Sequence, residues 1–162
     1  MQTVRRTFDV IKHFEQAAKV INLPAGVEVF RTGDPGEVMY VVTAGYANVL
    51  VGKTIVEIAA PGSLLGEMAL VDQKPRSATV VTRTSCKLVP IGITEFDLLV
   101  QETPAFGRYV LKIVTERLRR MNENLSATQK LEGVNFRVTA NTTRTMEDTS
   151  PSQARGAAGL PQ

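Results

Sequence analysis

The sequence predicts a mainly β protein, built as a sandwich or barrel, with helices on either side of it in the chain. Between residues 20 and 91, short runs of β-branched and aromatic residues alternate with turns that contain glycine or proline. Apolar residues at helical spacing occur before and after this region. The chain is 43% hydrophobic and 22% charged, as a globular protein is, and its 162 residues suffice for one domain and a tail.

A short amphipathic helix is expected near the N-terminus, over residues 7–18. Its apolar residues are spaced by 3, 3 and 4 positions: Phe8, Ile11, Phe14 and Ala18. His13, the only histidine, is interpreted as a surface or half-buried residue of this helix. Together with the single cysteine, Cys86, it cannot supply the ligands of a usual zinc site, so we expect no metal.

Seven β-rich runs follow, at residues 19–23, 27–30, 38–42, 46–51, 53–58, 78–82 and 86–91. Turn residues separate them, at Pro24-Ala25-Gly26, Gly33-Asp34-Pro35-Gly36, Ala44-Gly45, Gly52-Lys53 and Pro61-Gly62. Short strands at this regular spacing, punctuated by such turns, favour a sandwich or barrel over a parallel sheet with crossover helices.

Two helices are expected after the strands. Thr94 is predicted to cap a short helix that ends at Leu99, and Pro104 to occupy the first position of a longer one. The longer helix carries apolar residues at heptad spacing: Leu111, Val114, Leu118, Met121 and Leu125. This stripe either packs against the β domain or takes part in self-association.

Past about Gln129 the helical periodicity ends. Residues 139–162 are rich in Thr, Ser, Ala, Gly, Pro and Gln and cannot bury enough apolar surface to offset the entropy of ordering. We therefore expect a domain over residues 1–128 and a polar, disordered tail over residues 129–162. The absence of a signal peptide, a disulfide pair or an apolar run of about 20 residues favours the cytoplasm, away from membranes.

The segment of residues 62–80, here called the cassette, has the chemistry of a small nucleotide site. Gly66 permits backbone conformations closed to other residues. Residues 67–70 can form one helical turn, whose first N–H groups suit a phosphate. Arg76 offers a planar fork of donors for phosphate oxygens, and Ser77 adds a hydroxyl. Glu67 would repel phosphate but can accept a hydrogen bond from a ribose hydroxyl.

The cassette resembles the phosphate-binding cassette of cyclic-nucleotide-binding domains, the family of the catabolite activator protein, protein kinase A regulatory subunits and cyclic-nucleotide-gated channels. The family pattern, F-G-E-hydrophobic-A-L and then P-R-(S/T/A)-A-T, compares with Leu65-Gly66-Glu67-Met68-Ala69-Leu70 and Pro75-Arg76-Ser77-Ala78-Thr79. Leu65 departs from the common Phe. The resemblance extends from about residue 8 to about residue 128. It implies an eight-stranded jelly-roll β-barrel with a short N-terminal helix, a cassette helix and a long C-terminal lid helix.

The resemblance also implies the ligand-binding residues: Gly66, Glu67, Met68, Ala69, Arg76, Ser77 and Ala78 in the cassette, and Arg117, Met121 and Asn122 in the lid. Arg76 would bind the cyclic phosphate, with the Ser77 hydroxyl and the amide region of Ala69 beside it. Glu67 and the backbone of Gly66 would bind the ribose 2′-hydroxyl. The lid residues are candidates for covering the base. The expected ligand is cAMP, with cGMP left open.

The expected function is that of a non-enzymatic cAMP-binding regulatory protein. It would signal through its C-terminal helix to a separate, unidentified protein, as a monomer or weak homodimer. Two alternatives stay open: a fragment of a cAMP-responsive transcription factor or other multidomain effector, and a degenerate domain that no longer binds. DNA binding is not expected, because the 34 residues after 128 (162 − 128) show no helical pattern for a helix-turn-helix. A metal-dependent cupin enzyme would need several histidines.

Overall fold

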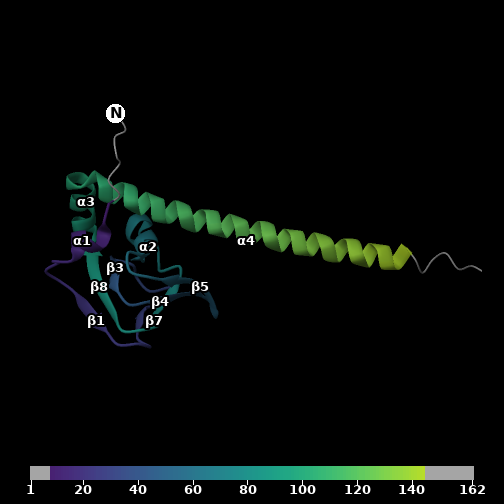
Figure 1. The fold of residues 1–162 in the computed structure, drawn as a ribbon, viewed down its shortest axis with the longest axis horizontal. Coiled ribbons are helices and arrows are strands. Elements are labelled where there is room, and N and C mark those ends of the chain that lie inside the picture. The colour runs from purple at the N-terminus through teal and green to yellow at the C-terminus, as the bar shows by residue number, and fades with distance from the viewer. Residues whose placement is uncertain (1–7, 145–162) are drawn as a thin grey trace, which may run out of the picture. The chain divides into compact units, whose positions relative to one another are not determined.

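The computed structural model describes residues 8–144 of the chain, and the side chains of residues 8–130 (Figure 1). The chain divides into two compact units, Met1–Glu116 and Arg117–Gln162. The first contains all eight strands, the helices α1 (Val10–Phe14), α2 (Glu67–Asp72) and α3 (Ile93–Glu102), and the beginning of α4 (Pro104–Arg144). The second contains the remainder of α4.

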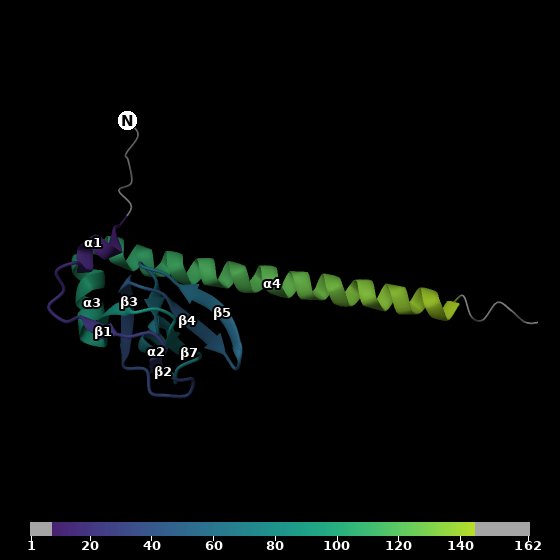
Figure 2. The same cartoon turned by 60° about the horizontal axis from the view of Figure 1, so that its bottom comes forward.

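The eight strands are β1 (Ile21–Leu23), β2 (Glu28–Phe30), β3 (Val38–Ala44), β4 (Ala47–Val51), β5 (Thr54–Ala59), β6 (Leu64–Leu65), β7 (Thr79–Thr82) and β8 (Cys86–Gly92). They form two antiparallel sheets with the strand orders β1-β8-β3-β6 and β2-β7-β4-β5 (Figure 2). Within the described residues no ladder joins the two sheets. The jelly roll predicted from the sequence is therefore confirmed as two sheets, which do not close into a barrel.

One apolar cluster lies between the two sheets. Its buried members come from both: Phe30, Val42, Ala47, Ala59, Leu65, Val80, Cys86 and Leu88. The alternation of side chains along each strand supplies them, since successive residues point to opposite faces of a sheet. On β7, for example, Val80 and Thr82 are buried while Thr79 and Val81 are half-buried.

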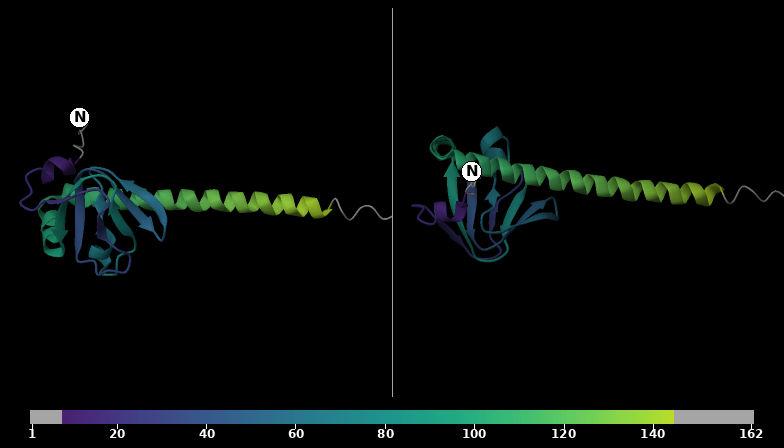
Figure 3. Two further views of the ribbon diagram at one scale, coloured as in Figure 1. Left: turned by 90° about the horizontal axis from the view of Figure 1, so that it is seen from below. Right: turned by 45° about the horizontal axis from the view of Figure 1, so that its top comes forward.

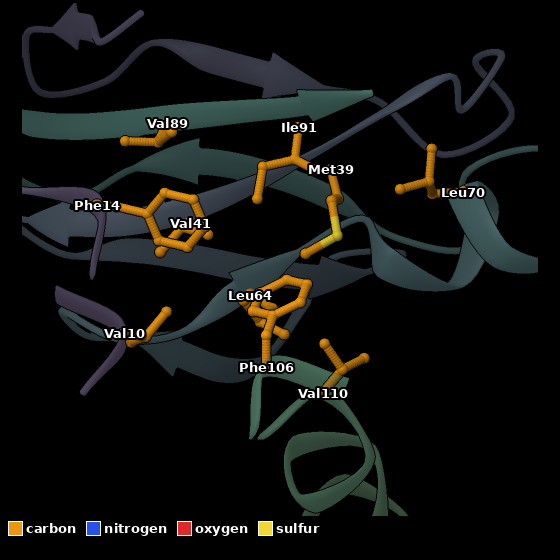
Figure 4. Close-up of a cluster of buried hydrophobic side chains, with 10 residues drawn as sticks. All are labelled: Val10, Phe14, Met39, Val41, Leu64, Leu70, Val89, Ile91, Phe106 and Val110. Atoms are coloured by element: carbon orange, nitrogen blue, oxygen red, sulfur yellow. The ribbon is translucent and has the colours of Figure 1, made fainter. Parts of the chain in front are cut away.

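A second cluster attaches the helices to the first sheet (Figure 4). Phe106 of α4 is fully buried among residues of α1 and β3, and its ring lies edge-on to that of Phe14 at 6.1 Å between centroids. Val110, one turn further along α4, belongs to the same cluster. Truncating a fully buried phenylalanine costs about 3–5 kcal/mol, so Phe106 is a main anchor of α4 on the β domain.

Two predicted helices differ from the structure at their ends. The first is shorter than residues 7–18: it begins at Val10, because Asp9 caps it by accepting a hydrogen bond from the amide of Lys12 at 3.0 Å, and it ends at Phe14. The prediction that Thr94 caps α3 is wrong: Gly92 is the N-cap. The carboxylate of Glu95 accepts a hydrogen bond from the Gly92 amide at 3.1 Å, so the chain passes from β8 directly into the helix.

The last helix begins at Pro104, as predicted, but continues through Arg144. Residues 129–144, which the sequence analysis assigned to a disordered tail, are therefore helical. A helix that is already nucleated adds one hydrogen bond for each further residue, which composition alone does not show. Residues 145–162 lie outside the described residues, and the domain boundary at residue 128 stays a prediction.

The apolar stripe of α4 is not the face that packs on the β domain in the first unit. Leu111 and Val114 are 67% and 39% exposed, while Phe106 and Val110 are buried. The first interpretation of the stripe, packing against the β domain, is therefore wrong for Leu111 and Val114. The heptad spacing could not reveal this, because Phe106 and Val110 follow the same helical period one position earlier.

Candidate functional site

Gly66 lies between β6 and α2 in a conformation and a space that exclude other residues. Its φ angle is +79°, in the left-handed region. A Cβ at this position would lie 2.2 Å from Nη1 of Arg76 and 3.3 Å from the ring of Phe30. Glu67, which follows, is only 3% exposed and begins α2. The predicted cassette helix is thus present: its N-cap, Gly66, lies beside Arg76 and Phe30, and its first residue is buried.

Arg76 is the most buried cation of the cassette, at 5% exposed. Its Nη1 donates to the carbonyl of Gly66 at 3.1 Å, and its Nη2 donates to the carbonyl of Val38 at 2.6 Å. The guanidinium lies 4.2 Å from the centroid of the Phe30 ring. Burial lowers the pKa of Arg76, although the charges of Tyr40, Asp34 and Glu67 act in the opposite direction.

One hydrogen-bond donor of Arg76 is unpaired among the described residues. Its Nε is buried and has no hydrogen-bond partner within the part of the chain that the structure describes. A buried donor without an acceptor costs about 1–3 kcal/mol, and such groups are rare in folded proteins. Both hydrogen-bond acceptors of the guanidinium, at Gly66 and Val38, are neutral carbonyls. An anion at this position would satisfy the remaining donor.

The loop between β2 and β3 closes around the arginine. The amide of Arg76 donates to the carbonyl of Asp34 at 2.9 Å, and the amide of Gly33 donates to the carbonyl of Arg76 at 2.9 Å. Gly36 lies against the cassette helix so closely that a Cβ there would be 2.1 Å from the Cβ of Ala69. Residues 33–36, the start of α2 and Arg76 therefore form one packed unit.

The other predicted cassette residues lie at its rim. Ser77 is exposed, with its hydroxyl 3.9 Å from the sulfur of Met68, and Ala78 is half-buried. Met68 is 54% exposed and Val71 is 60% exposed. These two side chains line an apolar groove of about 470 Å³ together with Phe96 and Val100 of α3 and Gly107, Val110, Leu111 and Val114 of α4.

The arrangement joins three features that suit a cyclic phosphate on a sugar. The first amides of α2 have no intrahelical acceptors, as at any helix start. Arg76 adds a buried positive charge with a donor to spare. Glu67 adds a buried carboxyl group one residue from the left-handed glycine. The structure therefore brings together Gly66, Glu67, Ala69 and Arg76, as the sequence predicted.

The candidate lid residues Arg117, Met121 and Asn122 belong to the second unit, on α4 beyond Glu116. Their assignment to the base stays a prediction. Sequence reasoning missed Phe30, Val38 and Gly36, which contact the cassette. Phe30 and Val38 carry no local signal, because they precede Arg76 by 46 (76 − 30) and 38 (76 − 38) positions.

Among residues 8–130, whose side chains the structure describes, no group of three or more His, Cys, Asp or Glu side chains could hold a metal ion. No helix within the described residues is long and apolar enough to span a bilayer.

Residues 20–103 match the profile of the family described as cyclic nucleotide-binding domain. A cyclic nucleotide-gated potassium channel of Mesorhizobium japonicum is 33% identical over 108 residues, which cover 67% of this chain and 30% of the relative. A CRP-like cAMP-activated global transcriptional regulator of Mycobacterium tuberculosis is 26% identical over 113 residues, which cover 65% of this chain and 50% of the regulator.

Among solved structures, the Catabolite Activator Protein of Thermus thermophilus superposes with a TM-score of 0.61 at 25% identity. The superposition covers 68% of this chain and 55% of that protein. The alignments thus span about a third to a half of the curated relatives' length.

Proposed function

Because this chain belongs to the cyclic nucleotide-binding domain family, we propose that its first unit binds one cyclic purine nucleotide and acts as a non-enzymatic regulatory sensor. The observation that carries the proposal is the buried guanidinium of Arg76, which has an unpartnered Nε beside the start of the cassette helix. A negatively charged oxygen would give this donor a charge-assisted hydrogen bond.

We assign each cassette residue a role that its position supports. Arg76 binds the cyclic phosphate, with the Ser77 hydroxyl and the amide at Ala69 beside it. Glu67 and the carbonyl of Gly66 take the ribose 2′-hydroxyl, because a carboxylate can only accept hydrogen bonds and repels phosphate. The near-complete burial of Glu67 and Arg76 supports these roles, since charged side chains are seldom buried unless they are paired with another group.

The ligand is proposed from the relatives. The regulator of M. tuberculosis is named for activation by cAMP, and the channel of M. japonicum for gating by cyclic nucleotides. The two names together make cAMP and cGMP the first compounds to test. These relatives also leave open the alternative that this domain is part of a larger effector, such as a transcription regulator.

Binding can become a signal through the apolar groove. It lies between α2, α3 and the first part of α4, and its walls include the exposed apolar side chains of Met68, Val71 and Leu111. A ligand that draws α2 inward changes how much of this apolar surface α4 can cover. A shift of α4 requires that the ligand bind the two positions of the helix unequally. The proposed readout is a separate protein that recognises α4 in one position.

Calorimetric titration of the purified chain tests the proposal. We expect saturable one-to-one binding of cAMP or cGMP, and much weaker binding of 5′-AMP, whose phosphate is not cyclic. Amide exchange should slow on binding both in residues 66–77 and in residues 104–125. No binding of either cyclic nucleotide would support the degenerate-domain alternative. Protection confined to the cassette would refute signalling through α4.

A further inference from the structure

On the edge strand β5, large apolar side chains are exposed and an acidic side chain is partly buried, which is the reverse of the pattern usual in a half-buried strand. Ile58 is 49% exposed and Val56 is 55% exposed, whereas Glu57 between them is half-buried and Ala59 is fully buried. Within the described residues β5 pairs only with β4, so it forms the end of its sheet (Figures 2 and 3). Because alternate residues share a face, Glu57 lies on the inner face with Ala59. An acidic residue occupies a position where an apolar one is expected.

The strand register places Glu57 in a row that leads to the cassette. Glu57 pairs with Val49 of β4, and Val49 pairs with Val80 of β7. Val80 in turn pairs with Phe30 of β2. The row Phe30, Val80, Val49 and Glu57 therefore crosses the whole inner face of this sheet. With strands about 4.8 Å apart, its two ends are separated by about 14 Å.

Side chains of opposite charge lie at the two ends of this row. The guanidinium of Arg76 lies 4.2 Å from the Phe30 ring at one end. Glu57 lies at the other end, and two valine side chains lie between them. A cyclic purine nucleotide has the same order: an anionic phosphate, a sugar, then a flat base whose outer edge carries hydrogen-bonding groups. Phosphate held by Arg76 would direct the base along the row, over Val49.

We propose that Glu57 binds the Watson–Crick edge of the purine and makes the site selective for cGMP over cAMP. This inference rests on the proposed function of the cassette. Guanine presents two adjacent donors, its N1–H and its 2-amino group, and both can donate to one carboxylate. Adenine presents one amino donor next to N1, whose lone pair a carboxylate repels. The position of Glu57 therefore favours cGMP, whereas the sequence analysis expected cAMP.

An inward-facing charge on an edge strand has a second known use. It discourages the strand from pairing with another chain. That role concerns aggregation and stability and is indifferent to the base of a bound nucleotide. The two roles are therefore separated by the ratio of cGMP to cAMP affinity, which an edge-protecting charge would leave unchanged.

Competition titrations with cGMP, cIMP and cAMP test the proposal on the full chain and on Glu57→Gln. We expect the parent to bind cGMP at least about tenfold more tightly than cAMP, as charge-assisted hydrogen bonds allow. Binding of cIMP should fall between them, because hypoxanthine keeps N1–H but lacks the 2-amino group. In Glu57→Gln the ratio should fall to within about threefold, with cGMP weakened and cAMP unchanged or tighter. A side-chain amide presents an N–H donor beside a carbonyl acceptor, and this pair suits the edge of either purine.

Ile58→Gln is the matched control, since it introduces the same side chain at the next position of β5, on the outer face. Its cGMP-to-cAMP ratio should equal that of the parent. Equal loss of all three nucleotides in Glu57→Gln, or a parent that prefers cAMP, would overturn the base assignment and leave the cassette proposal standing. Failure of the folded parent to bind any cyclic nucleotide would overturn both.

Discussion

Arg76 and Gly66 constrain each other across the cassette. Nη1 of Arg76 donates to the carbonyl of Gly66 at 3.1 Å and occupies the space that a side chain at position 66 would need. The two residues are ten positions apart (76 − 66), and the short helix α2 lies between them. A phosphate that binds the guanidinium would therefore be coupled directly to the start of α2.

Gly66→Ala should destabilise the fold and abolish nucleotide binding. The new Cβ would meet Arg76 at 2.2 Å, and alanine would have to adopt a φ of +79°. We expect a loss of about 2–5 kcal/mol in the free energy of unfolding, from backbone strain and overpacking together. Gly52→Ala is the control: its φ is +59°, but nothing lies within 4 Å of the new Cβ. Urea denaturation should show a loss of only about 1–2 kcal/mol there. Equal losses would mean that contact with Arg76 is unimportant.

Arg76→Lys should weaken cyclic-nucleotide binding by at least about tenfold, because one ammonium cannot replace the planar fork. The variant should also lose about 1–3 kcal/mol of stability, since the carbonyl of Gly66 or Val38 is left without its donor. Calorimetry and urea denaturation measure the two effects separately. Arg83→Lys, at an exposed position outside the cassette, should change neither. Undiminished affinity in Arg76→Lys would remove Arg76 from the phosphate.

Gly36→Ala should displace the cassette helix, because its Cβ would lie 2.1 Å from that of Ala69. We expect weaker nucleotide binding and a loss of about 1–3 kcal/mol in stability from overpacking. The double variant with Ala69→Gly removes the clash and should recover most of both, apart from about 1 kcal/mol for glycine in a helix. A double-mutant cycle gives the coupling energy. Simple additivity of the two losses would show that loop and helix do not press on each other in solution.

The ribose assignment predicts that 2′-deoxy-cAMP and 2′-deoxy-cGMP bind worse than their parents. A buried Glu67 without the 2′-hydroxyl loses a charge-assisted hydrogen bond, which corresponds to about 1.5–3 kcal/mol, or tenfold or more in affinity. Glu67→Gln should weaken the ribonucleotides and shrink the difference between ribo and deoxy forms. If the deoxy compounds bind the parent chain as well as the ribonucleotides do, neither Glu67 nor any other group of the protein gains affinity from the 2′-hydroxyl, and the assignment of Glu67 to the ribose is wrong.

Tyr109→Phe should loosen the beginning of α4. The Tyr109 hydroxyl donates to the carbonyl of Gly62 in the turn before β6, and its loss should cost about 1–2 kcal/mol of stability. Burial, and then the charges of Glu116 and Asp9, raise the pKa of Tyr109 above 10.0. The folded state thus favours the neutral phenol.

The stabilisation by Tyr109 is therefore complete below about pH 10 and is lost as pH rises through the folded pKa. The difference in unfolding free energy between the parent and Tyr109→Phe should shrink above pH 10. The exposed Tyr46, changed to Phe, serves as control. A difference that stays constant with pH would mean that the phenol ionises equally in both states.

The sequence determined the parts of this protein that depend on neighbours along the chain. Turn glycines and short β-branched runs predicted a β sandwich or barrel, although not the two-residue strand β6, and the resemblance of the cassette to a known family implied the jelly roll. The start of α4 followed from Pro104, whose fixed φ suits a first helical position. The cassette followed from Gly66, Glu67 and Arg76, because a short helix and its return loop bring them together over ten positions.

The tertiary structure alone decided what distant segments contribute. Phe30 and Val38 meet Arg76 through the pairing of β2 with β7 and the closure of the loop before β3, and no local pattern encodes those contacts. Likewise, the sequence showed Glu57 only as a charged residue in a strand. The register with Val49 and the burial of Ala59 fixed the face on which it lies. A shift of one residue would have turned it to solvent, since the side-chain period of a strand is two.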